Sequence, residues 1–261
     1  MTDLAAVLWL LGAFLILLFL LAWLSRAISI LVQELVYAFT RSTDAATVAI
    51  FLLFVPGVIV HEAAHWLTAR LLGLRTGKFR VWPRRSGRHI GLGSVSVESR
   101  NALVDSLVGI APLLAGTALI TAIANWVFAA STLVTALPQQ GVQAVLGGFF
   151  AALSRADGAL WAYLLFTIAN AMMPSASDRE PMTPVITYAV AFAALYVLLG
   201  MPLDFLAAAM VWAMPALQSL SAGLLFTVLL DLGVLAFLWL LRLLFPRSGH
   251  PPAPKNNRAT R

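Results

Sequence analysis

Two histidines flank a glutamate within an otherwise apolar stretch, in the sequence His61-Glu62-Ala63-Ala64-His65. On an α-helix, side chains four positions apart lie on the same face, so both imidazoles can reach one ion. The glutamate between them is well placed to act on a water molecule that the ion activates. The chain has no cysteine, so a metal site here must use His, Asp and Glu. The motif therefore predicts a metal site with His61 and His65 as ligands.

A structural role is the alternative for these residues, because a histidine in an apolar helix can simply hydrogen bond to a neighbouring helix. That alternative explains one histidine better than it explains two histidines and a glutamate. Three ionisable groups so close together in an apolar helix are costly unless something compensates for them. A bound cation is the natural compensation, so we favour metal binding.

A catalytic zinc site has three protein ligands and one open position, so a third ligand must come from a distant part of the chain. The candidates are Glu34, His89, Glu98, Asp105, Asp178, Glu180, Asp204 and Asp231. Asp178 is favoured because it ends an apolar stretch at a depth close to that of the two histidines. Asp231, near the middle of the last apolar stretch, is the chief rival. Nitrogen and oxygen ligands of this kind favour Zn²⁺.

The composition places these residues in a membrane protein. Hydrophobic residues make up 61% of the 261 positions and charged residues only 11%, whereas about a quarter of a soluble domain is charged. These figures exclude a water-soluble monomer and a disordered chain. We expect an all-α polytopic membrane protein in contact with the lipid bilayer. Its excess of positive charge indicates membrane topology and not nucleic-acid binding.

Six apolar stretches are predicted as membrane helices, for which about 20 residues are needed. They cover residues 4–24, 46–72, 102–128, 158–177, 182–199 and 220–245. Residues 28–39 are predicted as a separate interfacial helix, and a kink is predicted at Pro56-Gly57. The stretches 139–153 and 203–217 are too short to span comfortably, so we expect them to lie at the interface or to re-enter the membrane.

One long polar segment, residues 73–100, separates the second and third stretches and carries seven of the 17 Lys and Arg residues. Residue patterns over 78–82 and 90–98, around a turn at Ser86-Gly87, predict a small β-hairpin. With six spans, this segment and both termini share a face that holds 14 positive charges, against three on the other face. The positive-inside rule makes that face cytosolic. We therefore expect one membrane domain over residues 1–245 and a disordered, basic cytosolic tail over 246–261.

The membrane-embedded motif, together with an Asn–Asp pair at the end of a later apolar stretch, resembles the site-2 protease family of intramembrane zinc metalloproteases. The family's Asn–Asp spacing is kept in Asn170-Ala171-Met172-Met173-Pro174-Ser175-Ala176-Ser177-Asp178. Two details depart from the family pattern, since Pro174 falls one residue later than usual and Arg179 replaces the usual Gly. Gly109–Pro112 is a loose match to the family's Gly-Pro.

The resemblance implies a protease core over residues 46–180, in which His61, His65 and Asp178 bind Zn²⁺ and Glu62 is the general base. Asn170 would hold the substrate backbone or the developing oxyanion, with an ordinary interhelical hydrogen bond as an equal alternative. The substrate would be a transmembrane segment of another membrane protein, which must unwind before its amides can be attacked. The hairpin would offer a strand edge to that segment, while its arginines contact lipid headgroups.

Two other functions are weighed against the protease. A catalytically silent membrane adaptor or chaperone of the same fold would bind transmembrane helices, although the intact Glu62 argues against it. A transporter or metal carrier should show paired half-helices in two repeats, and no internal repeat is evident. Asp231 is expected to face protein, either paired with a hydroxyl or an Asn of a neighbouring helix or as part of a proton or water path.

Overall fold

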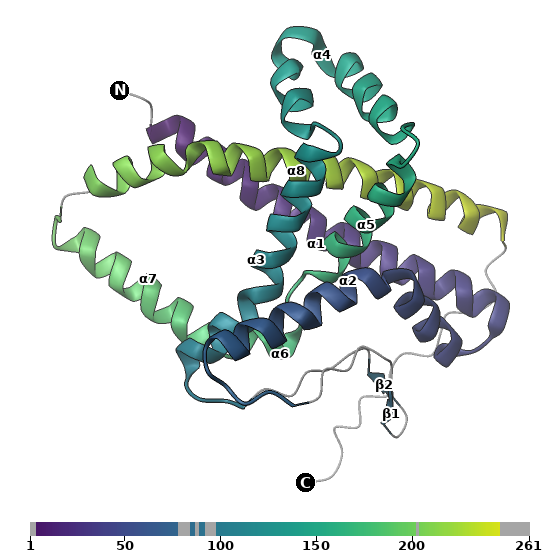
Figure 1. The fold of residues 1–261 in the computed structure, drawn as a ribbon, viewed down its shortest axis with the longest axis horizontal. Coiled ribbons are helices and arrows are strands. Elements are labelled where there is room, and N and C mark those ends of the chain that lie inside the picture. Colours follow the sequence, from purple (N-terminus) through teal and green to yellow (C-terminus); the bar gives the residue numbers. More distant parts are fainter. Residues whose placement is uncertain (1–3, 78–83, 87–88, 92–97, 202–203, 246–261) are drawn as a thin grey trace.

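The computed structural model describes residues 4–77, 84–86, 89–91, 98–201 and 204–245. The regular secondary structure of these residues consists of helices and one pair of short strands (Figure 1). The helices are α1 (Leu4–Thr40), α2 (Thr43–Leu71), α3 (Ala102–Trp126), α4 (Ala130–Leu153), α5 (Gly158–Ala171), α6 (Ala176–Arg179), α7 (Met182–Leu198) and α8 (Asp204–Leu244). The strands β1 (Arg84–Ser86) and β2 (His89–Gly91) pair antiparallel.

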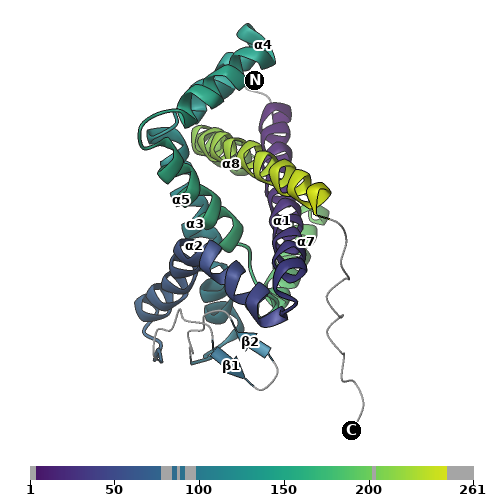
Figure 2. The same ribbon diagram turned by 90° about the vertical axis from the view of Figure 1, so that its right-hand side faces the viewer.

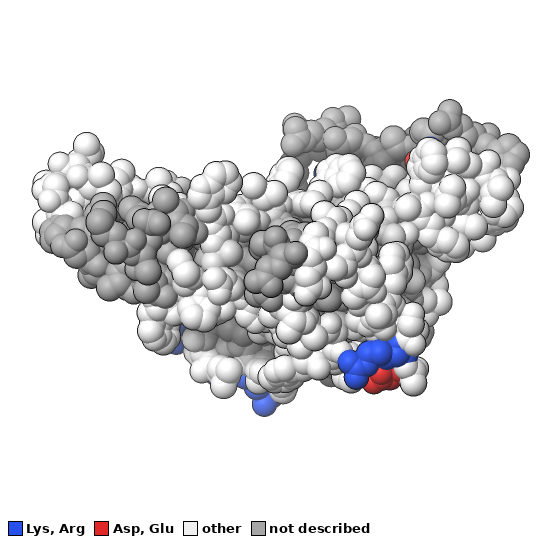
Figure 3. All heavy atoms as spheres, turned by 90° about the horizontal axis from the view of Figure 1, so that it is seen from above, with Lys and Arg blue, Asp and Glu red and all other residues white. Residues whose placement is uncertain are grey.

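Four helical segments are long and apolar enough to cross a membrane. They are Leu8–Thr40 in α1, Thr43–Leu71, Ala102–Trp126, and Trp212–Leu244 in α8. The outside of the molecule is apolar as well, since Trp9, Trp126 and Trp212 are more than four-fifths exposed. Figure 3 shows a face with few charged side chains. Apolar surface on this scale needs a nonaqueous surrounding, and together these features indicate a multi-pass membrane protein.

Three further apolar helices are shorter than a full span: the second part of α4 (Gln140–Leu153), α5 and α7. The predicted stretch 139–153 is part of α4, which kinks at Gly141 with φ 76° and ψ 175° and folds back on itself in Figure 1. Positive φ of this kind is open to glycine at little cost. By length alone, the described residues therefore supply four of the six predicted spans.

The first helix is continuous, so the predicted break between residues 24 and 28 is wrong. The polar residues Ser25 and Arg26 suggested an end, but neither Gly nor Pro interrupts the chain there. The Ser25 hydroxyl is used inside the protein, where it donates to the Asn170 carbonyl oxygen at 3.1 Å. In the same way, α8 joins the predicted stretches 203–217 and 220–245 into one helix that contains Pro215.

α1 and α8 run side by side in the same direction (Figure 1). Their carboxyl ends meet through the Glu34–Arg242 ion pair at 3.0 Å and through the rings of Phe39 and Phe245, whose centroids are 4.7 Å apart. The predicted layout placed Arg41 and Arg242 on opposite faces, which conflicts with these contacts. If both helices cross the membrane completely, the N-terminus and the C-terminal tail emerge on opposite faces.

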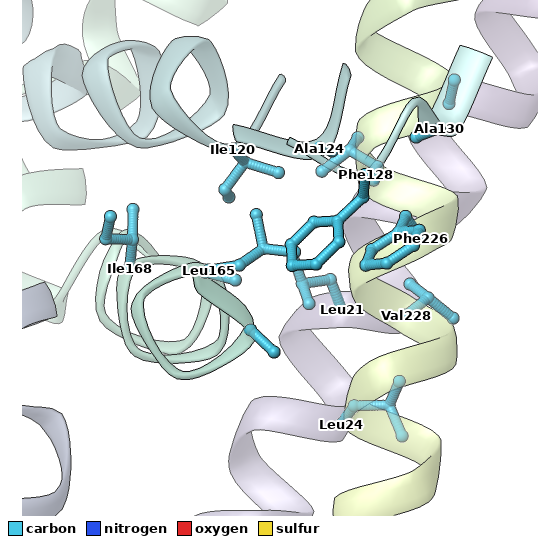
Figure 4. Packing of buried hydrophobic residues seen from close by; sticks show 14 of the residues in the cluster. Leu21, Leu24, Ile120, Ala124, Phe128, Ala130, Leu165, Ile168, Phe226 and Val228 are labelled. Atoms are coloured by element: carbon cyan, nitrogen blue, oxygen red, sulfur yellow. The ribbon is translucent and has the colours of Figure 1, made fainter. Parts of the chain in front are cut away.

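The core lies where α1, α3, α5 and α8 meet (Figure 4). Its fully buried side chains include Leu21, Leu24, Ile120, Leu165 and Leu224. The rings of Phe128 and Phe226 stack beside them with centroids 4.7 Å apart. This packing fixes the α1–α8 pair against α3, which carries Gly109–Pro112, and against α5, which carries Asn170.

α2 bends along its length in both ribbon views (Figures 1 and 2), in agreement with the predicted kink. Pro56 lies inside the helix, where it removes a backbone hydrogen bond and displaces the preceding turn. A Cβ on Gly57 would lie 1.9 Å from the Thr167 carbonyl oxygen, so α2 and α5 approach very closely there. Tyr163 of α5 also donates to the Leu53 carbonyl oxygen at 3.0 Å. The bend thus lies where α2 packs against α5, directly before the histidine-bearing half of α2.

The paired strands differ in position from the predicted hairpin. Arg84 pairs with Gly91 and Ser86 with His89, so the pairing lies within residues 84–91. The predicted strand over 78–82, most of the one over 90–98, and the tail 246–261 lie outside the described residues.

Candidate metal site

Three donor groups from two distant parts of the chain meet at one point. His61 and His65 belong to α2, and Asp178 belongs to α6. The two histidine Nε2 atoms are 3.1 Å apart, and Asp178 oxygens lie 3.7 Å from His61 Nε2 and 3.3 Å from His65 Nε2. Among the described residues, these three form the one group of His, Asp and Glu side chains that is close enough to hold a metal ion.

The distances fit those that a tetrahedral zinc ion requires. Zinc bonds to nitrogen and oxygen of about 2.0–2.1 Å place two tetrahedral ligands about 3.3 Å apart. The three separations, from 3.1 to 3.7 Å, surround that value. Two imidazoles and one carboxylate are also a donor set that catalytic zinc uses, with the fourth position left for water or substrate. The residues present therefore fit a zinc ion.

α3 orients His65 for metal binding. The Nδ1 atom of His65 lies 2.9 Å from the Val108 carbonyl oxygen. A carbonyl oxygen can only accept, so Nδ1 carries the proton and Nε2 presents its lone pair toward His61 and Asp178. A hydrogen bond of this kind from the second ring nitrogen commonly fixes the orientation of a metal-binding histidine. The Nδ1 atom of His61 is buried and has no hydrogen-bond partner among the described residues.

A capping box holds Asp178. The Ser175 N–H donates to Asp178 Oδ2 at 2.7 Å, and the Asp178 N–H donates to Ser175 Oγ at 3.3 Å. This reciprocal pair starts α6 and fixes the carboxylate. The predicted stretch 158–177 is therefore wrong at its end, because α5 stops at Ala171 and Asp178 lies in a separate short helix. The Ser-x-x-Asp spacing directly after Pro174 was the sequence signal for this second start.

α3 also holds the backbone of Asp178. A Cβ on Gly109 would lie 2.4 Å from the Asp178 carbonyl oxygen, so the close approach depends on glycine. The adjacent residues Val108 and Gly109 thus each contact a candidate ligand. Val108 contacts His65, and Gly109 contacts Asp178. The part played by Val108 has no sequence signal, because a backbone carbonyl is common to every residue.

The site is shielded without being sealed, since the side chains of its three residues are 11–13% exposed. Burial raises the pKa of the Asp178 carboxyl, but its polar contacts with His61, His65 and Ser175 outweigh burial and hold that pKa well below its usual range. Asp178 is therefore ionised at neutral pH, as a metal ligand must be.

Glu62 lies beside the three ligands and is not one of them. It is buried on α2, with 9% of its surface exposed. As the residue after His61, it is turned about 100° around the helix axis from that ligand. This position suits a group that handles protons next to the ion.

Asn170 and Asp231 contact each other. The Asn170 Nδ2 donates to both carboxylate oxygens of Asp231 at 3.2 Å and to the Phe166 carbonyl oxygen at 2.8 Å. The prediction that Asp231 pairs with a hydroxyl or an Asn of a neighbouring helix is confirmed. Asp231 is outside the metal group, so the rival assignment as third ligand is not supported. For Asn170, the structure shows the interhelical hydrogen bond.

The other candidates for a third ligand also lie elsewhere. Glu34 pairs with Arg242, and Asp105 accepts from the Ser99 hydroxyl and the Arg100 N–H. Glu98 and Glu180 are not in the metal group. The side chains of His89 and Asp204 lie outside the described residues.

Comparisons with protein-family models, with curated proteins and with solved structures gave no match. The metal site is therefore defined by its own residues and distances.

Proposed function

We propose that this protein is an intramembrane zinc metalloprotease that hydrolyses peptide bonds in or near transmembrane segments of other membrane proteins. The observation that carries the proposal is the meeting of His61, His65 and Asp178 at 3.1–3.7 Å, with Glu62 beside them. The resemblance of both sequence motifs to the site-2 protease family supports the same function. When bound, zinc would polarise a peptide carbonyl and lower the pKa of a water molecule to about 7.

The chain's own residues have separate roles in this proposal. Glu62 takes a proton from the attacking water and returns it to the leaving amine. His61, His65 and Asp178 hold the ion, while Val108 and Ser175 keep two of these ligands oriented before substrate arrives. Asn170 is assigned no contact with substrate, because its amide nitrogen is bound to Asp231.

The depth of the site supports a membrane-embedded substrate. His61 and His65 precede the last residue of α2, Leu71, by ten and six positions, or about 15 and 9 Å along the helix axis. A peptide that reaches this depth comes from within the membrane. Its amides are hidden in helical hydrogen bonds, so the best substrate is a transmembrane helix that unwinds easily.

We further propose a cell-membrane domain in which one of the two shorter helices α5 and α7 joins the four long spans, with segment 73–100 in the cytosol. One further crossing gives five spans, which is what the parallel α1 and α8 require if both cross completely. The seven positive charges of that segment support this orientation. The chain has no cysteine, so single cysteines at Thr76 and Arg41, on either side of α2, report their faces by labelling of intact cells. Thr76→Cys should be protected and Arg41→Cys labelled. Labelling of both from outside contradicts a complete crossing by α2.

The experiment that tests the activity uses protein reconstituted in liposomes with a single-span model substrate whose transmembrane helix contains Gly and Pro. Wild-type protein should cut this probe, and Glu62→Gln should retain zinc and lose cleavage. Full cleavage by Glu62→Gln contradicts the role of the base. Zinc-loaded wild-type protein that binds the probe without cutting it favours the silent adaptor.

A further inference from the structure

A carboxylate that the proposed catalysis does not use lies deep in the membrane domain. Asp231 is within the apolar segment Trp212–Leu244 of α8 and has no exposed surface. Within the described part of the chain its carboxylate has one hydrogen-bond donor, the amide of Asn170. An acid at such a place is costly, and one shared N–H is modest compensation, so packing alone would favour a Leu. The cost points to a task for Asp231.

The contact of Asp231 with Asn170 indicates what this task is. Asn170 is the second-last residue of α5 and is gripped from two other helices. Its side chain donates to Asp231 of α8, and its backbone carbonyl accepts from the Ser25 hydroxyl of α1. The α1–α8 pair therefore fixes the point at which the chain leaves α5.

The nine residues from Asn170 to Asp178 are anchored at a few points. Met172 is buried against α3, where a Cβ on Gly116 would lie 2.5 Å from the Met172 Cβ. The Ser175 capping box and the contact of Asp178 with Gly109 then complete the path to the metal group. Asn170 is the first of these fixed points, so its position determines where the α5–α6 connection starts.

We infer that Asp231 is a positioning residue, which acts through Asn170 to hold the α5–α6 connection that presents Asp178. The α1–α8 pair, which lies outside the proposed protease core of residues 46–180, thus acts on the site through one buried amide–carboxylate contact. The relevance to a metal rests on the proposed function. The positioning itself is a property of the polypeptide and is measurable in metal-free protein.

Hydrogen exchange of the backbone amides between residues 172 and 178, Pro174 excepted, tests the positioning in full-length, metal-free protein in nanodiscs. Asp231→Leu should speed exchange there about tenfold, whereas Asp231→Asn, which keeps an acceptor for the Asn170 amide, should stay near wild type. Thr227→Val is the matched control, because the Thr227 hydroxyl is equally buried in α8 and donates within its own helix, to the Gly223 carbonyl oxygen. It should leave exchange unchanged.

The route through Asn170 has its own test. Asn170→Leu should speed exchange as much as Asp231→Leu does, and the double variant should be no faster than either one. Ser25→Ala removes only the hydrogen bond to the Asn170 carbonyl oxygen. It should therefore give a smaller increase in the exchange rate of the same amides. Unchanged exchange in Asp231→Leu overturns the inference, and so does a double variant whose effect is the product of the two single effects.

Zinc affinity adds a second readout. Asp231→Leu should bind zinc about tenfold more weakly, with Asp231→Asn and Thr227→Val at wild-type affinity. Wild-type affinity in Asp231→Leu overturns the inference while the proposed metal site stands. A wild-type protein that binds no zinc refutes the metal site instead, and the exchange of residues 172–178 still decides the positioning role of Asp231.

Discussion

Two groups of polar side chains lie among the apolar helices, and they are satisfied in opposite ways. In the group of His61, His65 and Asp178, three atoms able to donate lone pairs face one another within 3.7 Å. In the pair of Asp231 and Asn170, an acceptor faces a donor. The first group is 11–13% exposed and the acid of the second is completely buried.

The difference separates a binding site from a structural contact. In the second group the Asn170 amide donates to the Asp231 carboxylate, whereas the first gathers lone pairs that a cation satisfies far better than they satisfy one another. The partial exposure of the first group leaves it accessible to an ion and a substrate, whereas the completely buried Asp231 is not accessible. Burial alone therefore does not identify the acid that binds a metal. Asp178 is identified because its carboxylate and the two imidazoles converge on one point.

The largest expected effect is on zinc binding when a ligand is removed. His65→Ala or Asp178→Ala deletes one of three protein ligands, so zinc affinity should fall by about 100-fold or more, beyond the 10–100-fold that residues behind the ligands contribute. Asp231→Asn should change it little. Isothermal titration of purified, metal-free proteins measures this contrast, and equal losses at Asp178 and Asp231 would erase the distinction between the two groups.

The second effect is on stability. Asn170→Ala leaves the buried Asp231 without its donor, so the free energy of unfolding should fall by about 1.5–3 kcal/mol. Adding Asp231→Leu should recover part of the loss, because no unpaired carboxylate then remains. Denaturant unfolding in detergent gives these values. A double variant that loses the full sum of the single losses argues that the two residues do not act as a pair.

The third effect comes from the support beneath the metal group. Gly109→Ala brings a methyl group against the Asp178 carbonyl oxygen, so α3 and α6 must separate at a cost of about 1–3 kcal/mol. Gly233→Ala is the control, since a Cβ there meets nothing within 4 Å. Thermal unfolding of both variants, and zinc titration of each, should show losses at Gly109 only. Wild-type behaviour of Gly109→Ala would remove α3 from the account of the site.

The smallest effect is at the capping box. Ser175→Ala removes the hydroxyl that accepts from the Asp178 N–H, and loss of such a cap costs about 1 kcal/mol. Zinc affinity should fall by a few-fold, less than for either ligand variant. Thr187→Ala is the control, because the Thr187 hydroxyl donates within its own helix α7, to the Thr183 carbonyl oxygen. Identical zinc affinities in the two variants would show that the cap does not position the carboxylate.

The local parts of the site were predictable from the sequence. His61, Glu62 and His65 are close because helix geometry places residues i and i+4 together. Asp178 was favoured by depth and by resemblance to a known motif, and the structure brings it to the two histidines. The carbonyl of Val108 and the bond from Asn170 to Asp231 were beyond a sequence argument, because they depend on which helix faces lie together.

The misjudged elements share one cause. The break in α1 and the end of the fourth stretch were both placed by polarity, although polar residues within a protein are satisfied by neighbouring helices. Ser25, for example, bonds to Asn170, and Glu34 pairs with Arg242. Helix ends follow caps and breakers, as at Ser175, more closely than they follow hydropathy. The charge count over six spans shared this weakness, because it could not show that α1 and α8 run parallel.

The most direct test of the account is zinc K-edge X-ray absorption on purified wild-type protein loaded with one equivalent of Zn²⁺. The account predicts one zinc per chain, with two imidazole nitrogens and at least one carboxylate oxygen at about 2.0–2.1 Å, and loss of this signal in Asp178→Ala. Zinc that binds without imidazole ligands, or an unchanged signal in Asp178→Ala, would contradict it.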